Sequence, residues 1–234
     1  MANVQELKQY RNIHLIGIGG TSMSGIAQIL KHWGYNVTGS DANASDNTEK
    51  LINSKIYVTI GSDPSILNNV DLVIYSAAIR DTDPELSRAR ELGIPTIERG
   101  PFLGQLTHSF RNTISISGTH GKSTTSAMVS MCFIEAKQDP TIQIGANIPA
   151  INGNYRLGNS ENFIIESCEY ADSFLNFAPK AEIILNIDND HLDYFKNLDN
   201  IKAAFVKFVK LLPDDGILVY NADDENCSHI SKNT

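Results

Sequence analysis

The sequence predicts an α/β protein of two domains, each built around a parallel β-sheet. Short apolar runs alternate with segments in which apolar residues recur every three or four positions, the pattern of buried strands followed by helices. Two glycine-rich loops, at 17–25 and 118–125, each follow an apolar run and open a helical segment. The length of 234 residues exceeds that of one typical domain and therefore favours two.

Composition and charge argue against several classes of protein. Asp and Glu number 27 against 19 Lys and Arg, a formal net charge of −8, which is unsuited to general nucleic-acid binding. The three cysteines lie far apart without a C-x-x-C pair, so no disulfide framework or zinc site is expected, and the cytoplasm is the expected compartment. Residues 1–11 are too polar for a signal peptide, and no apolar run approaches the ~20 residues of a membrane helix.

The first domain is expected to span residues 1–107. Its elements are predicted from apolar runs that end at glycine or small polar residues, and from helical spacing between those runs. In chain order they are a strand at 13–18, a helix at 22–32, strands at 35–39 and 70–75, a helix at 83–92 and a strand at 94–97. This alternation predicts a Rossmann-like parallel sheet.

The second domain is expected to span residues 108–234 and to be incomplete. A β-branched strand at 113–117 leads into a tight loop at 118–122, the setting of a P-loop in an α/β nucleotide-binding domain. The further elements in chain order are a helix at 123–136, strands at 163–166 and 182–187, a helix at 200–211 and a strand at 216–220. The tail at 227–234 is expected to carry no strong element.

The loop that opens the second domain carries the sharpest chemical signal. Its glycines let backbone N–H groups turn toward phosphate oxygens, and the start of the following helix adds partial positive charge. Lys122 can reach the terminal phosphates, the Ser123 hydroxyl can ligate Mg²⁺, and His120 either contacts phosphate or points to solvent. Ile116 stands at the first glycine position of the longer P-loop pattern, so a glycine-rich turn with a solvated lysine is the alternative. The candidate nucleotide-binding residues are Gly118, Thr119, His120, Gly121, Lys122, Ser123 and Thr124.

Acidic residues follow the predicted strand at 163–166. A carboxylate at the carboxyl end of a buried strand beside a P-loop is suited to Mg²⁺, which makes Glu166 the first candidate and Glu169 the second. His191 follows the next predicted strand and could ligate a metal, with Asp190 orienting it. The alternatives are solvated acids in a loop and a structural histidine.

The loop at 17–25 is similar to a dinucleotide-binding fingerprint but has Ser22 where the third glycine is expected. Asp41 ends the second predicted strand, about where an acid that binds a ribose is expected. This geometry suits NAD or a UDP-sugar, because both carry a diphosphate. A glycine-rich turn used only for packing is the alternative.

Taken together, these segments resemble the Mur ligases, the ATP-dependent ligases of cell-wall precursor synthesis. The resemblance runs from about residue 13 to residue 224. Segments that resemble the UDP-binding loop of the alanine-adding branch, and the two segments after it, are 14–20 with 23–27, 39–41 and 76–79. Segments that resemble its ATP loop, acidic segment and metal-binding histidine segment are 118–122, 166–170 with 173–175, and 186–191.

The resemblance implies ATP-dependent ligation of L-alanine to UDP-N-acetylmuramate through an acyl phosphate, in peptidoglycan precursor synthesis. ATP and Mg²⁺ are the implied cofactors. The implied catalytic residues are Lys122, Glu166 and His191, with the metals held by Ser123, Glu166 and His191. The residues implied to hold the UDP substrate are Gly17, Gly19, Gly20, Thr21, Ser22, Ser40, Asp41 and Ser76. The family has three domains, so ligation by this chain alone is not expected.

Several alternatives remain open at this point. Phe205 stands where the ligases that add later residues carry a carbamylated lysine, which fits both the alanine-adding branch and the murein peptide recycling ligases. The first glycine loop alone also fits an NAD(P)-dependent oxidoreductase, although that leaves the second loop unexplained. A non-catalytic nucleotide-binding fragment is the third alternative, and the sequence does not determine the oligomeric state.

Overall fold

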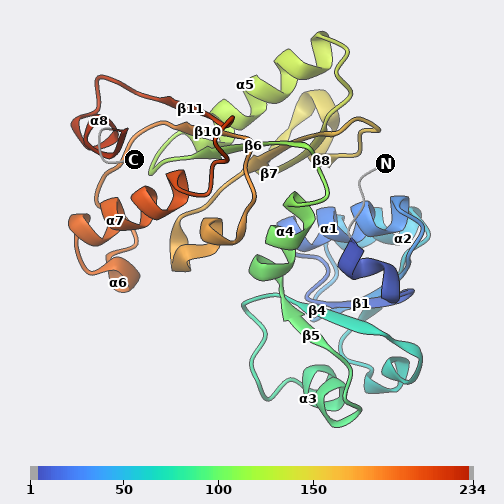
Figure 1. Ribbon diagram of the computed structural model, residues 1–234. Helices are drawn as coiled ribbons and strands as arrows, with labels where there is room; N and C mark the ends of the chain where they lie inside the picture. Colours follow the sequence, from blue (N-terminus) through green and yellow to red (C-terminus); the bar gives the residue numbers. More distant parts are fainter. Residues whose placement is uncertain (1–4, 232–234) are drawn as a thin grey trace. The chain divides into compact units, whose positions relative to one another are not determined.

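The computed structural model describes residues 5–231, and it divides between Phe102 and Leu103 into two compact units (Figure 1). Residues 1–4, part of the segment judged too polar for a signal peptide, and residues 232–234, the end of the tail, lie outside the described residues. Helix α4 (Arg99–Thr107) runs across the division. The expected domain boundary after residue 107 coincides with the end of this helix and stays a prediction.

The first unit is a five-stranded parallel sheet in the order β3-β2-β1-β4-β5. Its strands are β1 (Asn12–Ile16), β2 (Asn36–Asp41), β3 (Tyr57–Ile60), β4 (Leu72–Tyr75) and β5 (Thr96–Glu98). Its helices are η1 (Gln5–Gln9), α1 (Thr21–His32), α2 (Asp46–Asn53), η2 (Pro64–Asn69) and α3 (Pro84–Glu91). The strand order reverses between β1 and β4, and ligands of such sheets bind in the crevice at that point.

The second unit is a six-stranded sheet in the order β11-β10-β6-β9-β7-β8, parallel except for the β7–β8 pair. Its strands are β6 (Asn112–Ser117), β7 (Thr141–Ile148), β8 (Gly153–Arg156), β9 (Asn162–Glu166), β10 (Ala181–Ile184) and β11 (Ile217–Tyr220). Its helices are α5 (Lys122–Glu135), η3 (Pro149–Ile151), η4 (Tyr170–Asn176), α6 (Leu192–Phe195), α7 (Leu198–Val209) and α8 (Glu225–Ser231). Within the described residues, no helix is long and apolar enough to cross a lipid bilayer.

Two apolar layers cover the two faces of the second sheet. Ile183 packs into the layer that α5 covers, together with Ile116 and Ile164. Its neighbour Ile184 packs into the opposite layer, where Phe205 of α7 is fully buried. Successive residues of a strand point to opposite faces, and here both faces are covered. Buried residues therefore lie on both faces of the strands, and in β6 the apolar Ile114 and Ile116 alternate with the buried Ser115 and Ser117.

The predicted α/β fold is confirmed, with the ends of its strands and helices shifted by a few residues. The strand predicted at 182–187 ends at Ile184, because the chain there turns toward the P-loop. The sequence patterns did not indicate α2, β3, β7 or β8. The expectation of no strong element in the tail is wrong: α8 buries Cys227 and Ile230 against the apolar layer of α7. Cys227 and Ile230 are three positions apart, so they lie on one side of the helix. These two residues are enough to pack α8 against the apolar residues of α7.

A buried polar network supports the carboxyl end of β2. The Glu85 carboxylate, fully buried, accepts hydrogen bonds from the Ser40 hydroxyl and from the Asp63 N–H at 2.7 Å, and lies 3.2 Å from Nε2 of His14. Burial alone would raise the pKa of Glu85, yet hydrogen bonds from His14, Ser40 and Asp63 hold it below its usual value. The network fixes the strand end that carries Asp41.

A second buried carboxyl group has no such support. Glu182 of β10 is fully buried, and neither of its carboxyl oxygens has a hydrogen-bond partner among the described residues. It pairs across the sheet with Ser115 of β6, whose hydroxyl is likewise buried and unpartnered. Burial raises the pKa of Glu182 to about 9, so the group is protonated in the folded chain at neutral pH.

This burial predicts a pH dependence of stability. The unfolded chain releases the Glu182 proton near the ordinary value of 4.5, whereas the folded chain holds it to about 9. Stability is therefore lost as pH rises between these values, by at most ~1.4 kcal/mol per pH unit. Glu182→Gln does not titrate, so the free energy of unfolding of the variant minus that of the wild type should grow between pH 5.5 and pH 8. Urea unfolding at both pH values measures it, and an unchanged difference would contradict the buried, protonated state.

Candidate active site

Three neighbouring strands of the second unit end at one edge of the sheet. β6 lies between β10 and β9, with Ser117 beside Ile184 and Ile116 beside Glu166. The loops that follow these strands carry the P-loop, the acidic segment and the histidine segment. Parallel pairing therefore brings together three parts of the sequence that are about 70 residues apart at most.

The P-loop needs both of its glycines. Gly118 and Gly121 have φ of 135° and 85°, in the left-handed region that L side chains rarely adopt. A Cβ at Gly118 would also lie 3.0 Å from the Cβ of Leu185 and 3.1 Å from the backbone of Asn186. The loop leads into α5, whose first turn has no side-chain cap and so leaves backbone N–H groups for an anion. An open cavity of about 320 Å³ here is lined by Thr119, His120, Gly121, Lys122, Ser123, Thr124 and Glu166.

Asn186 fixes the shape of the P-loop from the neighbouring strand end. Its Oδ1 accepts from the His120 N–H at 2.7 Å, its Nδ2 donates to the His120 carbonyl at 3.0 Å, and its carbonyl accepts from the Thr119 N–H at 3.0 Å. The Thr119 hydroxyl also accepts from the Asp188 N–H at 2.8 Å. The sequence patterns gave Asn186 no role. Its side-chain amide both accepts from and donates to the backbone of a loop that is distant in the sequence, and such contacts leave no local signal. The His120 side chain is exposed at the rim of the cavity.

Lys122 is not a solvated lysine. Its Nζ donates to the carbonyl of Gly118 at 2.7 Å and to that of Thr119 at 3.3 Å, and pairs with Oε2 of Glu169 at 3.1 Å. The two charged side chains are 14% and 2% exposed, so Glu169 is not a solvated loop acid either. A positive partner stabilises a buried carboxylate, and Lys122 is that partner here.

Glu166 projects into the cavity from the end of β9. Its Oε2 accepts hydrogen bonds from the Ser123 hydroxyl at 2.9 Å and from the Gly145 N–H at 2.8 Å. A Cβ at Gly145 would lie 3.1 Å from the same oxygen, so this position admits glycine best. The sequence placed Glu166 and Ser123 together as metal ligands, and the structure brings their oxygens into contact. The support from Gly145 had no sequence signal.

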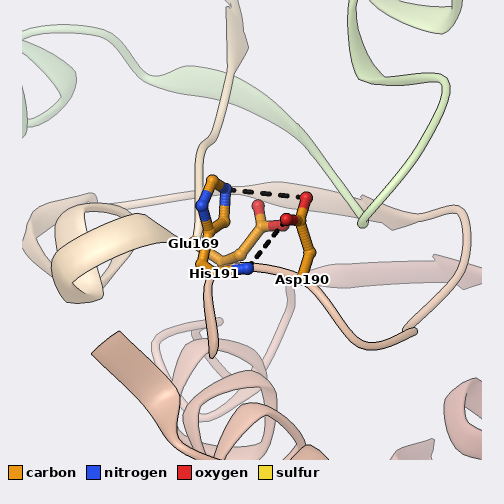
Figure 2. A group of neighbouring side chains, drawn as sticks. All are labelled: Glu169, Asp190 and His191. Atoms are coloured by element: carbon orange, nitrogen blue, oxygen red, sulfur yellow. Dashed lines mark hydrogen bonds and ion pairs between the residues drawn. The ribbon is translucent and has the colours of Figure 1, made fainter. Parts of the chain in front are cut away.

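His191 lies beside Glu169 and Asp190 (Figure 2), and the group does not include Glu166. One ligand atom from each of the three side chains lies within 4.8 Å of the others. Asp190 accepts from the His191 N–H at 2.7 Å, and its Oδ2 lies 3.7 Å from Nε2 of that ring. The two carboxylates suit Mg²⁺ or Mn²⁺, and the imidazole adds a nitrogen ligand of the kind that transition metals prefer. The metal positions predicted at Glu166 and His191 thus fall into two neighbouring groups, and Glu169, the second choice, belongs with His191.

The glycine loop of the first unit lies at the carboxyl end of β1. The Ser40 carbonyl accepts from the N–H groups of Gly17 and Ile18 at 2.8 and 3.0 Å, and Asp41 accepts from the Gly19 N–H at 2.9 Å. A Cβ at Gly19 would lie 2.9 Å from both the Asp41 carboxylate and the Thr48 methyl, so the loop has no room for a side chain there. The Ser40 hydroxyl is buried against Glu85, so Ser40 supports the loop through its carbonyl.

The remaining residues expected to hold the UDP substrate surround this loop. Thr21 and Ser22 open α1, which begins after Gly20 without a side-chain cap, as α5 begins after Gly121. The Cβ of Ser76, at the end of β4, lies 3.1 Å from where a Cβ at Gly17 would stand. The loop therefore lies at the point where the strand order reverses, where a diphosphate is expected to bind.

Comparison with known proteins gives consistent matches to one family. The family described as Mur ligase family, catalytic domain, matches residues 12–111, and Mur ligase middle domain matches residues 116–234. A UDP-N-acetylmuramate--L-alanine ligase of Clostridium novyi is 50% identical over 222 residues, which cover 95% of this chain and 48% of that protein. The chain thus spans about half the length of the curated relatives it matches.

Two solved structures have the same fold. The UDP-N-acetylmuramate-alanine ligase MurC of Thermotoga maritima matches with a TM-score of 0.85 and 32% identity, over 94% of this chain and 51% of that one. The UDP-N-acetylmuramate:L-alanyl-gamma-D-glutamyl-meso-diaminopimelate ligase of Neisseria meningitides matches with a TM-score of 0.85 and 26% identity, over 96% of this chain and 75% of that one. Since the middle-domain family alone accounts for half of the sequence, this chain belongs to the Mur ligase family.

Proposed function

We propose that this chain supplies the UDP-substrate and ATP sites of a ligase that joins L-alanine to UDP-N-acetylmuramate in the cytoplasm. The observation that carries the proposal is the meeting of the P-loop, the Lys122–Glu169 ion pair and the Glu169–Asp190–His191 group at one sheet edge. The relative that is 50% identical bears the name of this reaction. Because the chain spans about half of that relative, ligation is proposed for the whole protein.

ATP is proposed to bind with its phosphates in the cavity before α5. The N–H groups at the start of the helix and the Lys122 ammonium provide positive charge, and Ser123 and Glu166 provide adjacent oxygens for Mg²⁺. A bound Mg²⁺ supplies Lewis-acid stabilisation of charge on the phosphoryl oxygens. These residues would hold the γ-phosphate, and attack on it by the substrate carboxylate would give an acyl phosphate and ADP.

Lys122 cannot serve Glu169 and a phosphate equally. Its ammonium is folded back onto its own loop and onto Glu169, which is only 2% exposed. Moving Lys122 to a phosphate would leave this carboxylate buried without a partner, which is costly. A divalent cation held by Glu169, Asp190 and His191 removes that cost. We therefore expect metal binding at this group to release Lys122 for the nucleotide.

The substrate of the first loop is proposed to be a UDP-sugar rather than NAD(P). An oxidoreductase would give the P-loop and its metal-type group no role. Within the family, the curated relative at 50% and the MurC structure at 32% carry names of alanine ligases, whereas the structure of the enzyme named for a tripeptide substrate is 26% identical. The higher identity to the alanine ligases favours alanine addition. Peptide recycling is the second candidate.

Replacing Lys122 tests the nucleotide site. Lys122→Ala removes a charged hydrogen-bond donor of roughly 1.5–3 kcal/mol, so Mg²⁺-ATP affinity should fall by about 10- to 100-fold. Isothermal titration calorimetry on the 234-residue chain measures the loss. Lys210→Ala, at the exposed end of α7, is the matched control and should bind as the wild type does. Equal affinity for wild type and Lys122→Ala would mean that ATP does not bind at the P-loop.

Replacing Gly19 tests the substrate site of the first unit. Gly19→Val places a side chain where the Asp41 carboxylate and Thr48 methyl leave 2.9 Å, so the loop must open and UDP-N-acetylmuramate affinity should fall at least ~10-fold. Gly34→Asn is the control, because it lies beyond the far end of α1 with open space around it and asparagine tolerates its positive φ. If calorimetry finds the same affinity for Gly19→Val and the control, UDP-N-acetylmuramate does not bind at this loop.

A further inference from the structure

The two segments that carry the metal-type group are joined by reciprocal tyrosine–aspartate hydrogen bonds. Tyr170 Oη donates to Asp193 Oδ2 at 3.2 Å, and Tyr194 Oη donates to Asp172 Oδ2 at 2.7 Å. Tyr170 and Asp172 lie within three residues after Glu169, and Asp193 and Tyr194 lie within three residues after His191. Each segment therefore gives one phenol and one carboxylate to the other.

The Tyr170 ring also contacts the histidine of the group. Its centroid lies 4.7 Å from that of the His191 ring, with 51° between the planes, and 6.0 Å from that of the Tyr194 ring. Tyr170 thus packs against His191, and its hydroxyl donates a hydrogen bond to Asp193, two positions after His191. The His191 ring and the carboxylates of Glu169 and Asp190 face one another (Figure 2).

The backbone on both sides of this contact is in an unfavourable conformation. Ala171 and Asp172 have φ of 52° and 55°, and His191 has φ of 50°, although none of them is glycine. Such residues persist where the surrounding contacts hold them, and they cluster at functional sites. η4 contains a kink at Ala171 and Asp172, and α6 has a single short turn, so neither segment is held by sheet pairing.

Each tyrosine donates its hydrogen bond to an aspartate side chain of the other segment. Both phenols are solvent-exposed, at 43% and 41%, so their burial does not explain why these side chains lie at this place. Both hydrogen bonds join the two segments that flank the group.

We propose that Tyr170, Asp193, Tyr194 and Asp172 form a clamp that positions His191 against Glu169 and Asp190, and thereby sets the affinity of the group for a divalent cation. The four are positioning residues, because their hydrogen bonds join the segment that carries Glu169 to the segment that carries Asp190 and His191. The inference rests on the proposed function in so far as the group binds Mg²⁺.

Manganese binding to the 234-residue chain tests the clamp. Tyr170→Phe and Tyr194→Phe remove only the two hydroxyls and change no charge and no ring, so a change in metal affinity cannot come from electrostatics at the group. Removing partners that orient metal ligands costs about 10–100-fold in affinity, and we expect the double variant to bind Mn²⁺ at least ~10-fold more weakly. Electron paramagnetic resonance of free Mn²⁺ measures the affinity. Tyr220→Phe, on β11 of the same unit, is the control.

Two further variants separate the clamp from the metal site itself. His191→Ala should abolish the Mn²⁺ binding at the Glu169–Asp190–His191 group. If His191→Ala abolishes it but the double phenylalanine variant binds within twofold of the control, the metal site stands and the clamp is wrong. If His191→Ala binds as the wild type does, both ideas fail. Tyr170→Phe, Asp193→Asn and their combination should weaken binding non-additively, because all three break the same bond; additive losses would also count against the clamp. Thermal unfolding of each variant should stay near that of the wild type.

Discussion

The parallel pairing of β10, β6 and β9 is the constraint on which the second unit depends. Because of this pairing, three strands end at one edge of the sheet. The polar and charged groups of the loops that follow them form hydrogen bonds and an ion pair with one another. Asn186 bonds the P-loop backbone on both sides, and Lys122 and Glu169 neutralise each other within reach of Asp190 and His191. Without that register, the loop glycines, the lysine and the acids would lie on separate parts of the surface.

The two units share one local arrangement of strand, glycine loop and helix. In each, a strand ends in a glycine loop, a helix begins without a side-chain cap, and the neighbouring strand end supports the loop. The support differs in kind. In the first unit the Ser40 carbonyl and the Asp41 carboxylate hold the loop N–H groups, backed by buried Glu85. In the second, Asn186 holds the loop and a buried ion pair sets the charge.

The sequence predicted what has a local signal and missed what depends on distant contacts. Strand–loop–helix order and glycine spacing located both loops, and strand ends located Glu166 and His191. The partner of His191 could not be read from spacing: Glu166 and Glu169 are three residues apart, and only the turn after β9 decides that Glu169 faces His191 while Glu166 faces Ser123. α8 was missed because its apolar residues are few, and their partners lie on α7.

The proposed function depends on one electrostatic interaction: Lys122 pairs with Glu169 until a divalent cation held by Glu169, Asp190 and His191 releases it for the nucleotide. The most direct measurement is ATP affinity of wild type and Glu169→Gln, with and without Mg²⁺, and with the exposed Glu161→Gln as control. Without metal, Glu169→Gln should bind ATP more tightly than the wild type, because Lys122 is already free, and added Mg²⁺ should improve its affinity less. If Glu169→Gln binds metal-free ATP no better than the wild type, and Mg²⁺ strengthens both equally, the claim is contradicted.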